Sequence, residues 1–414
     1  MKIQTKTLKV ELDPTDKQRE ILSGYFPKLT QAWNYLVEAS RRGDYKNTKG
    51  NLYDLIKDWK YNKEWFDGLS QHLNQMAREQ FYEAYKEWKK GIRDRPQSKE
   101  DGNLRSVRTA LNKSAGLEYY EPGTYDSFKF DSTVGVLKTK EPIVIPPNVV
   151  NDSSSKKYVR VKREKDGKWF GLFSVDLLVD YPHPEELERH EWVGIDPGLN
   201  SLVTLSDGRT FHAPELETLE EYKARKTQLQ RGLSRKQRGS KNWKAQKDRI
   251  RKYDKKIKRK RDDILHKVSR QIVGFTTEEG YKGIAWEGTS IDAMYEEEGF
   301  SAHRKDQISN MAWNQLMRFV EYKAHEEGLA FCQQDAVGKF ASSKTCHQCT
   351  EKHDVNNCGE YSTFECPHCD RVQSRDVNAA RNIRDAVYLI SQGDEEDWDR
   401  DALREELRNL RNGT

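Results

Sequence analysis

Residues 192–205 have the sequence WVGIDPGLNSLVTL, in which Pro197-Gly198 separates two short apolar runs. Each run has the length of a buried strand, and a Pro-Gly pair is typical of a tight turn. A second turn at Asp207-Gly208 and a third short strand, over 210–212, come next, and helical sequence follows them. The stretch therefore predicts the opening strands of an α/β domain that begins near residue 191.

The same alternation of strand and helix continues toward the C-terminus. A strand is expected over 283–287 (GIAWE), a helix over 308–326 and a further strand over 329–334. Elements that alternate in this order are typical of an α/β sheet with helices packed on it.

Three acidic residues stand at the edges of this α/β region. Asp196 ends the first strand, Glu287 ends GIAWE, and Asp376 lies in SRDVNAARNI at the expected start of a helix. Carboxylates that converge from distant positions suit two hard divalent cations, which prefer oxygen ligands. Taken singly, each acid is more often a surface or capping residue, and Asp376 has the position of a helix N-cap.

Two Cys-x-x-Cys pairs, Cys346/Cys349 and Cys366/Cys369, are separated by sixteen residues. Four thiolates at this spacing predict a tetrahedral zinc site, which is structural because no coordination position stays open. The neighbouring residues that compete as ligands lack a partner at that spacing; they are Cys358, His347, His353 and His368. Cys332, in an apolar strand, is expected in the core.

Positive charge is concentrated in one segment. Lys223–Arg261 contains nineteen Lys and Arg against Asp248 and Asp254, a local net charge of +17, whereas the whole chain carries +5 and the remainder about −12. Apolar positions at helical spacing, from Ile250 to Ile272, leave the opposite face almost entirely basic. Such clustering favours a nucleic-acid partner, because clustered cations release counterions from phosphates. The residues expected to contact phosphates are Arg235, Lys236, Arg238, Lys241, Lys244, Lys247, Arg251, Lys255 and Lys258.

The first half of the chain has two patterns. Residues 2–12 alternate as a strand does, and helical spacing then extends from Pro14 to about residue 92, including helices over 52–59 and 73–88. The polar and basic stretch 92–115 is expected to be a loop. The aromatic side chains of the helices are expected to pack in a core rather than to stack on bases; they are Trp33, Trp59, Trp65, Tyr82 and Trp88.

From residue 117 to 180 the pattern is that of strands, including PIVIPP and a hairpin around Asp166-Gly167. The N-terminal strand should pair with these strands, which makes the helical block an insertion in a small β-barrel. The last residues, 393–414, are expected to be a tail or surface helix of little consequence.

Charged residues make up 34% of the chain and hydrophobic residues 35%, and the mean hydropathy is −1.00. No stretch approaches the roughly 20 apolar residues that span a bilayer, and the N-terminus lacks the apolar core of a signal peptide. We therefore expect a cytoplasmic protein with reduced thiols.

The order of these motifs resembles the TnpB family of insertion sequences, which is related to the miniature type V CRISPR nucleases. The resemblance rests on GIDPGL, the basic segment from Gln230 to Ser269, a strand-end glutamate, the four-cysteine ribbon and the final RDVNAARNI. The ribbon immediately precedes the last acid, which is the distinctive part of the pattern. The match is good over about 190–390 and weak in the N-terminal part.

The resemblance implies an α+β multidomain protein with an RNase H-like RuvC domain. It also implies a wedge barrel and a helical recognition lobe that together grip guide RNA and target DNA. The implied division is a wedge barrel at 1–13 and 117–190, a recognition lobe at 14–116, a RuvC-like domain at 191–343 and 371–392, a zinc ribbon at 344–370 and a tail at 393–414.

The resemblance also implies an activity, RNA-guided cleavage of double-stranded DNA beside a short flanking motif. Asp196, Glu287 and Asp376 would hold two Mg²⁺ ions, or Mn²⁺, with Asp196 bridging them, and cleavage would leave a 5′-phosphate. The zinc ion of the ribbon would be structural. The resemblance implies a prokaryotic, nucleoid-associated protein and no membrane partner.

The chain departs from the family pattern at three places: residues 288–291 (GTSI) after the glutamate, Asp262-Asp263 at the end of the basic segment, and the extra Cys358. None of them removes an expected metal ligand. Three alternative functions remain open: a compact type V CRISPR effector, which shares every motif, a nuclease-dead RNA-guided repressor, and a DNA transposase with a similar acidic triad.

Overall fold

The structure is a computed structural model that divides the chain into two compact units, residues 2–178 and residues 179–414 together with Met1. The structure describes residues 1–44, 48, 50–51, 54–55, 71–99, 106–111, 121–150, 157–164, 166–198, 201–287, 312–334, 342–352, 363–393 and 400–412. The expected features that lie outside these ranges are the helix over 52–59 apart from positions 54 and 55, the helix start at 308–311, residues 288–291, Trp59, Trp65, His353 and Cys358.

The first unit is built on a mainly antiparallel sheet of six strands in the order β2-β5-β6-β1-β4-β3. The edge strands β2 and β3 contact each other, so the sheet curls toward a barrel. The expected N-terminal strand is confirmed as β1, between β6 and β4. The strands are β1 (Lys2–Leu12), β2 (Ser106–Leu111), β3 (Gly123–Asp131), β4 (Gly135–Ile145), β5 (Lys157–Arg163) and β6 (Trp169–Val179).

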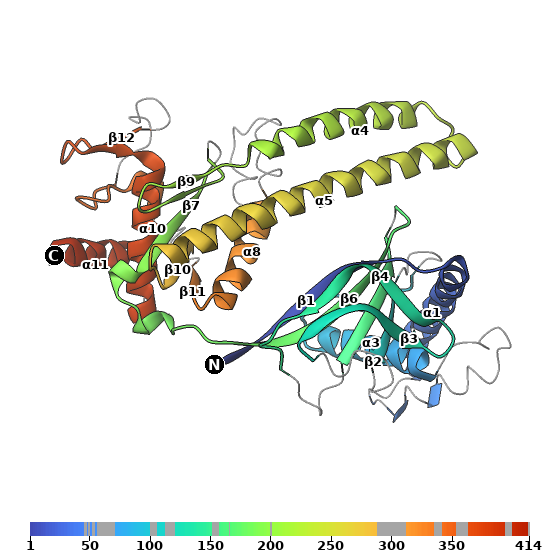
Figure 1. Cartoon of the computed structure of the whole chain (residues 1–414). Coiled ribbons are helices and arrows are strands. Elements are labelled where there is room, and N and C mark those ends of the chain that lie inside the picture. The colour runs from blue at the N-terminus through green and yellow to red at the C-terminus, as the bar shows by residue number, and fades with distance from the viewer. Residues whose placement is uncertain are drawn as a thin grey trace. The chain divides into compact units, whose positions relative to one another are not determined.

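The two helices of this unit that are described along their whole length are α1 (Asp16–Arg42) and α3 (Gln71–Lys89) (Figure 1). Helix α1 begins with a reciprocal capping box between Thr15 and Gln18 and ends at Gly43, which has a positive φ. The buried Trp33 ring packs edge-on against Phe81, with ring centroids 5.6 Å apart. This confirms for Trp33 the expected role in the core.

The expectation of a loop over 92–115 is wrong at β2. This strand pairs with β5 along its full length, from Ser106 opposite Lys162 to Leu111 opposite Lys157. Val107 is buried at 1% exposure, whereas the guanidinium of Arg108 covers the Tyr158 ring at 3.9 Å. Pairing to β5 thus places one small apolar side chain in the core, which the polar composition of the segment concealed.

The second unit contains a five-stranded sheet in the order β11-β10-β7-β8-β9. Strand β7 pairs antiparallel with β8 and parallel with β10, and β10 pairs parallel with β11. The expected strands are confirmed to within one or two residues. They are β7 (Trp192–Pro197), β8 (Val203–Leu205), β9 (Thr210–Phe211), β10 (Gly283–Glu287) and β11 (Ala330–Gln334).

Helices cover both faces of this sheet. Val193 and Ile195 of β7 share a core with α5 (Lys241–Glu278) and α8 (Trp313–Glu326), whereas Trp192 shares a core with α10 (Arg375–Gln392) and α11 (Arg400–Asn412). Side chains of a strand point alternately to its two faces. Even-numbered positions of β7 therefore face α10, and odd-numbered positions face α5 and α8.

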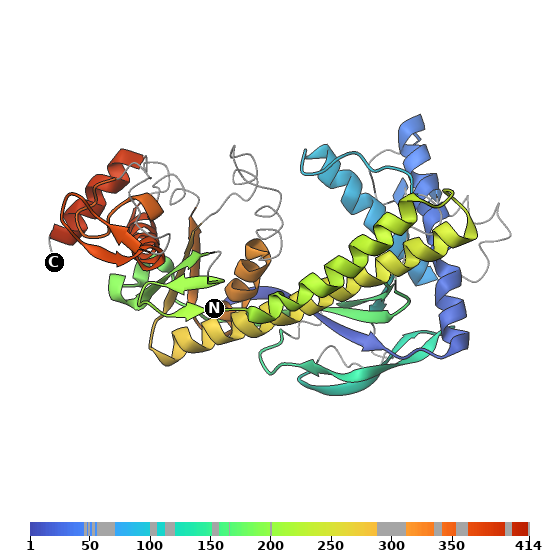
Figure 2. The ribbon, with the colours of Figure 1, turned by 90° about the horizontal axis from the view of Figure 1, so that it is seen from above.

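Helix α4 (Thr218–Ser234) runs beside α5 and forms a long hairpin with it, as both views show (Figures 1 and 2). With 38 residues, α5 is about 57 Å long at about 1.5 Å per residue. Its expected apolar stripe is buried from Ile264 to Ile272, where it joins the core beneath the sheet. In the part of the chain that the structure describes, no helix has the length and apolar character to cross a membrane.

Candidate functional site

Asp196 and Glu287 lie side by side at the carboxyl ends of parallel strands. Trp286 is the register partner of Ile195, so each acid is the next residue along its own strand. Neighbouring strands lie about 4.8 Å apart. By the alternation along β7 and β10, both carboxylates are on the face that α10 covers, because Gly194 and Ala285 contact that helix.

The close approach of α10 brings Asp376 to the same place. A Cβ on Gly194 would lie 2.0 Å from the carbonyl oxygen of Ala380, so the helix can pack here only against a glycine. At the turn after β7, a Cβ on Gly198 would lie 3.9 Å from Oδ2 of Asp376. The three acids predicted from the sequence are therefore brought together on one face of the sheet.

Asp376 is not the N-cap of α10. That position belongs to Ser374, whose hydroxyl accepts a hydrogen bond from the backbone N–H of Val377 at 3.5 Å. The capping interpretation of Asp376 is therefore wrong. Its carboxylate lies in the first turn, where the helix dipole favours negative charge, and is left available for another partner.

The electrostatics of the three acids identify Asp196 as the central one. Burial raises the pKa of Asp196 well above its usual value, and the charges of Glu287 and Asp376 raise it further. Burial also raises the pKa of Glu287, which a hydrogen bond from Ser342 partly opposes, and that of Asp376, which Arg375 partly opposes. Grouped negative charge of this kind is costly without a cation.

The four cysteines form the tightest cluster of ligand atoms in the described residues, and all four sulfurs lie within 4.8 Å of one another. Sγ atoms are 3.8 Å apart for Cys346 and Cys369 and 3.5 Å apart for Cys349 and Cys366. A metal bound by four thiolates at about 2.3 Å needs sulfurs about 3.8 Å apart, so the cluster fits a tetrahedral metal site.

The two Cys-x-x-Cys turns have the same backbone geometry. The backbone N–H of Thr350 donates to the carbonyl oxygen of Cys346 at 3.0 Å, and that of Asp370 donates to the carbonyl oxygen of Cys366 at 2.9 Å. Both residues have a positive φ, 63° and 56°, which is uncommon outside glycine. Burial raises the pKa of the Cys366 thiol, but hydrogen bonds from the backbone of His368 and Cys369 and from the neighbouring cysteine side chains together lower it. The turns thus direct the sulfurs toward one common point.

His347 is engaged elsewhere and does not join the cysteines. Its Nε2 lies 3.0 Å from Oδ2 of Asp385 in α10, and burial lowers the pKa of the imidazole. His368 is exposed and lies outside the group of clustered ligand atoms. Cys332 is partly buried against the α10 core, which agrees with its expected place.

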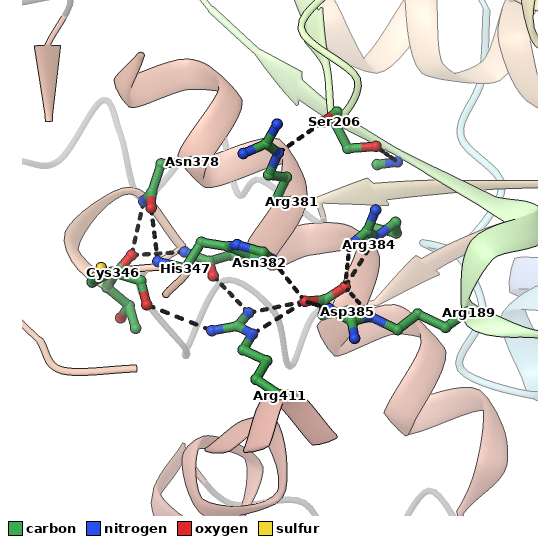
Figure 3. A network of polar contacts seen from close by, with 12 residues as sticks. Arg189, Ser206, Cys346, His347, Asn378, Arg381, Asn382, Arg384, Asp385 and Arg411 are labelled. Carbon is green, nitrogen blue, oxygen red and sulfur yellow. Dashed lines mark hydrogen bonds and ion pairs between the residues drawn. The ribbon is translucent and has the colours of Figure 1, made fainter. Parts of the chain in front are cut away.

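A face of α10 holds the cysteine ribbon to the sheet domain (Figure 3). Asn378 Nδ2 donates to the carbonyl of Thr345 at 2.8 Å, and its Oδ1 accepts from the backbone N–H of His347 at 2.8 Å. Asn382 Nδ2 donates to the carbonyl of Ser342 at 2.7 Å and to that of Thr345 at 2.7 Å. Both asparagines are fully buried, so each bond replaces one to water.

Asp385, one turn further along α10, is a buried carboxylate surrounded by cations. Figure 3 shows Arg189, Arg384 and Arg411 directed at its two oxygens, with contacts from 2.8 to 3.2 Å. Burial alone would raise the pKa of Asp385, but the hydrogen bond from His347 and the charges of the arginines lower it far below its usual range. The arginines and His347 thus favour the ionised form of this buried carboxylate.

The expectation that residues 393–414 are of little consequence is wrong for α11. Leu403 and Leu407 are buried against α10, and the Arg411 side chain is only 6% exposed. Arg411 also donates to Asn382 Oδ1 at 2.9 Å and to the carbonyl of Cys346 at 3.5 Å. The last helix thus ties α10 to the first cysteine turn.

The nine expected phosphate-binding residues lie on the α4–α5 hairpin or on the turn that joins its helices. Arg235, Arg238, Lys241, Lys244 and Lys258 are exposed, and the other four are half-buried. Lys247 lies over the Trp243 ring at 4.7 Å, Arg251 pairs with Asp248 at 2.9 Å and Lys258 pairs with Asp262 at 3.2 Å. The exposed cations are concentrated where α4 ends and α5 begins.

Sequence reasoning missed the polar residues that connect these sites, namely Ser342, Asn378, Asn382, Asp385, Arg189 and Arg411. A signal was present in the helix RDVNAARNIRDAV, in which Asn378, Asn382 and Asp385 recur at i, i+4 and i+7. Polar residues at this spacing share one helix face, and three of them beside alanines indicate a buried polar contact.

Two family comparisons match separate parts of the chain. Residues 160–291 match the family OrfB_IS605, described as "Probable transposase", and residues 313–383 match the family described as "Cas12f1-like, TNB domain". The first match includes the basic hairpin with Asp196 and Glu287, and the second includes the four cysteines with Asp376.

Related proteins match over most of the chain. One from Streptomyces pristinaespiralis, named "Putative RNA-guided DNA endonuclease", is 27% identical over 93% of this chain and 90% of its own length. A second from Escherichia coli K12, with the same name and the designation InsQ, is 26% identical over 73% of this chain and 79% of its own length. A "TnpB-like protein" of Acanthamoeba polyphaga mimivirus, L770, is 22% identical over 66% of this chain and 50% of its own length.

A solved structure has the same fold. The Cas12f1 chain in its complex with sgRNA and target DNA aligns with a TM-score of 0.54 and 13% identity, over 92% of this chain and 99% of that one. The mixed α/β architecture is therefore shared with Cas12f1.

Proposed function

This chain belongs to the TnpB family, and on that premise we propose that it is a transposon-associated RNA-guided DNA endonuclease. The observation that carries the proposal is the convergence of Asp196, Glu287 and Asp376 on the α10 face of one sheet. The curated relatives that align over most of the chain bear the same activity in their names.

The sheet supports an RNase H-like, RuvC-type assignment for the second unit. Three antiparallel strands, β7 to β9, are followed by two strands, β10 and β11, that run parallel to β7. This mixed order places the ends of β7 and β10 side by side under the start of α10, where an acidic site can form. The domain division proposed from the sequence then changes at one place: β2, within residues 14–116, belongs to the sheet of the wedge barrel.

The three grouped carboxylates suit two divalent cations, because hard cations prefer oxygen ligands and would offset the negative charge that raises the pKa of Asp196. Asp196 responds to both other acids, so it would be the shared ligand, with Glu287 and Asp376 each completing one position. Bound Mg²⁺, or Mn²⁺, would supply activation of water and stabilisation of the leaving 3′-oxygen.

The basic hairpin and the cysteine cluster would bind nucleic acid and stabilise the fold, respectively. The exposed cations of the α4–α5 hairpin would neutralise phosphates of guide RNA or of the RNA–DNA heteroduplex, which orients the duplex without reading its bases. The four cysteines would hold a structural zinc ion, which leaves no coordination position for chemistry. A short flanking DNA motif would be the sequence element that the protein itself reads.

The decisive variant is Asp196→Ala, assayed with the RNA that co-purifies with the chain. Loss of one of three metal ligands should reduce cleavage of a matched DNA by at least about 10³-fold, while guide binding stays unchanged. Asp263→Ala is the matched control, because Asp263 is exposed and pairs with Lys267 on the helix surface. Cleavage by Asp196→Ala at the wild-type rate, or purification without a discrete RNA, would overturn the proposal.

A DNA transposase is a second candidate, favoured by the family match over residues 160–291. RNase H-like transposases use a comparable set of acids, so the acids alone do not separate the two activities. Joined DNA products in a strand-transfer assay with purified protein would support the transposase. A compact CRISPR effector would be recognised by a repeat array beside its gene, and a nuclease-dead repressor by guided binding without cleavage.

A further inference from the structure

One member of the acidic site is held by a residue that has no place in the metal-binding set. Ser342 Oγ donates to Glu287 Oε1 at 2.9 Å. Ser342 is 2% exposed, so water competes little for this hydroxyl. A hydrogen bond to an ionised group is roughly twice as strong as one between neutral groups. The contact therefore restricts the rotation of the Glu287 carboxylate.

Ser342 is fixed in turn by the helix that carries Asp376. It belongs to the three-residue helix η6 (Ser342–Lys344), between β11 and the first cysteine turn. Asn382 of α10 donates to the Ser342 carbonyl and to the Thr345 carbonyl, both at 2.7 Å. Because Asn382 and Asp376 share α10, the path Glu287–Ser342–Asn382 connects two acids that stand on different elements.

We propose that Ser342 and Asn382 are positioning residues that hold the Glu287 carboxylate at a set orientation toward Asp376, and thereby adjust the affinity of the acidic site for divalent cations. This inference rests on the proposed function, since it takes Glu287 and Asp376 as ligands of the cations. The short helix η6 before the ribbon would then do more than pack against α10, because it would also orient a metal ligand.

Removal of the Ser342 hydroxyl distinguishes a role in orienting Glu287 from a role in packing. The bonds from Asn382 are made to backbone carbonyls, so alanine at position 342 keeps them and removes only the contact to Glu287. Ser343 is the next residue of the same helix, and Ser343→Ala removes the same group one position away. The pair Ser342→Ala and Ser343→Ala is therefore matched in composition and in local backbone.

The test measures Mn²⁺ binding to the full-length chain by electron paramagnetic resonance, and not only cleavage. For Ser342→Ala we expect the dissociation constant for Mn²⁺ to rise about ten-fold, which corresponds to about 1.4 kcal/mol. Ser343→Ala should bind as the wild type does. In cleavage assays, the Mg²⁺ concentration for half-maximal rate should rise by about the same factor, while the rate at saturating Mg²⁺ stays within about three-fold.

Zinc content and melting temperature check that the variants fold. If Ser342→Ala does not fold, Ser342→Cys keeps a weaker donor of similar size, and its dissociation constant for Mn²⁺ should still rise above that of the wild type. Unchanged Mn²⁺ affinity in folded Ser342→Ala, or an equal loss in Ser343→Ala, would overturn the inference.

Asp196→Ala distinguishes this failure from failure of the proposed function. If Asp196→Ala loses Mn²⁺ binding and cleavage while Ser342→Ala keeps wild-type affinity, only the positioning role is wrong. If Asp196→Ala binds Mn²⁺ and cleaves as the wild type does, the acidic site itself is wrong, and the positioning role is overturned with it.

Discussion

At the scale of single residues, the two most informative carboxylates have opposite electrostatic environments. Asp196 is surrounded by acids, and its pKa is raised well above 3.8. Asp385 is surrounded by arginines, and its pKa is lowered. Without a bound cation, the ionised Asp196 lowers the stability of the folded state. Asp385 has its counter-ions within the protein, so its ionised form stabilises the folded state. Both differences can be measured in the folded protein without any substrate.

We predict that Asp196→Asn stabilises the cation-free chain at pH 7. The raised pKa means that the folded state binds more protons than the unfolded state above pH 3.8, so wild-type stability falls as pH rises through that window. The amide carries no charge and removes the penalty. A rise in melting temperature of about 2–4 °C for each kcal/mol recovered is expected in thermal unfolding.

Two controls accompany this measurement. The difference between Asp196→Asn and wild type should disappear at acid pH, where the carboxyl is protonated, and saturating Mg²⁺ should raise the melting temperature of wild type alone. A cation-free Asp196→Asn that melts below wild type at pH 7 would contradict the electrostatic account.

The Asp385 carboxylate yields the opposite expectation. Asp385→Asn leaves Arg189, Arg384 and Arg411 without their shared counter-ion, and breaking a buried pair in this way costs about 3–5 kcal/mol. The loss should appear in denaturant unfolding as a lower midpoint with an unchanged slope. The matched variant Glu351→Gln breaks an exposed pair with Arg408 and should cost less than about 1 kcal/mol. Equal losses of stability in the two variants would contradict the assignment of Asp385 as the shared counter-ion of the three arginines.

At the scale of elements, the cysteine ribbon has too little core to fold by itself. Among the described residues of the ribbon, the buried cluster consists of Cys346, Phe364 and Cys366, at the short hairpin of β12 (Thr363–Glu365) and β13 (Val372–Ser374). A few buried side chains contribute only several kcal/mol, whereas zinc bound to small structural sites contributes about 10–16 kcal/mol. The fold of the ribbon should therefore depend on the metal.

Replacement of one ligand tests this dependence. Cys366→Ser should reduce bound zinc from about one ion per chain to a small fraction, and amide exchange should accelerate in the ribbon but not in β7 or β10. Cys332→Ser, which changes a partly buried cysteine of β11, should keep its zinc. Zinc content is measured by atomic emission, and full zinc occupancy in Cys366→Ser would exclude the four-thiolate site.

Sequence alone predicted the elements whose pattern is local. The strands β7, β8 and β10, the start of α10 and the two cysteine turns each follow from a short stretch with a clear period or spacing. Strand β2 was missed because it lies in a polar and basic segment, and its pairing with β5 is a long-range contact that no local pattern shows. The amphipathic helix α11 was recognised as a surface element, but its docking depends on Arg411 meeting Asp385, which no local pattern shows.

The acidic site was predictable for a related reason. Asp196 and Glu287 end strands, and strand ends of one sheet meet at one edge, so their proximity follows from topology. The contact between Ser342 and Glu287 was not predictable, because it joins a three-residue helix to a strand 55 positions away. Long-range polar contacts of this kind are decided by packing, after the elements have formed.

At the scale of the whole molecule, the small net charge is the sum of one strongly basic segment and an acidic remainder. The chain carries +5 in total, yet Lys223–Arg261 alone carries +17. Among the described residues, Arg238, Lys241 and Lys244 are exposed, and none of the three pairs with a carboxylate. Unpaired cations near the turn between two long helices are the part of this surface most able to displace counterions from a phosphate backbone.

Neutralising these three cations should change the salt dependence of RNA binding more than its sequence preference. Each lost phosphate contact lowers the slope of log K against log salt by about 0.7–0.9, so Arg238→Gln, Lys241→Gln and Lys244→Gln together should lower it by about 2–3. Filter binding between 50 and 300 mM salt, roughly the range in which such slopes are resolved, measures the effect. A matched triple variant changes three cations that are already ion-paired, Lys267, Arg270 and Lys282. It alters the net charge equally, so an equal loss of slope would mean that total charge, and not the helical hairpin, binds the nucleic acid.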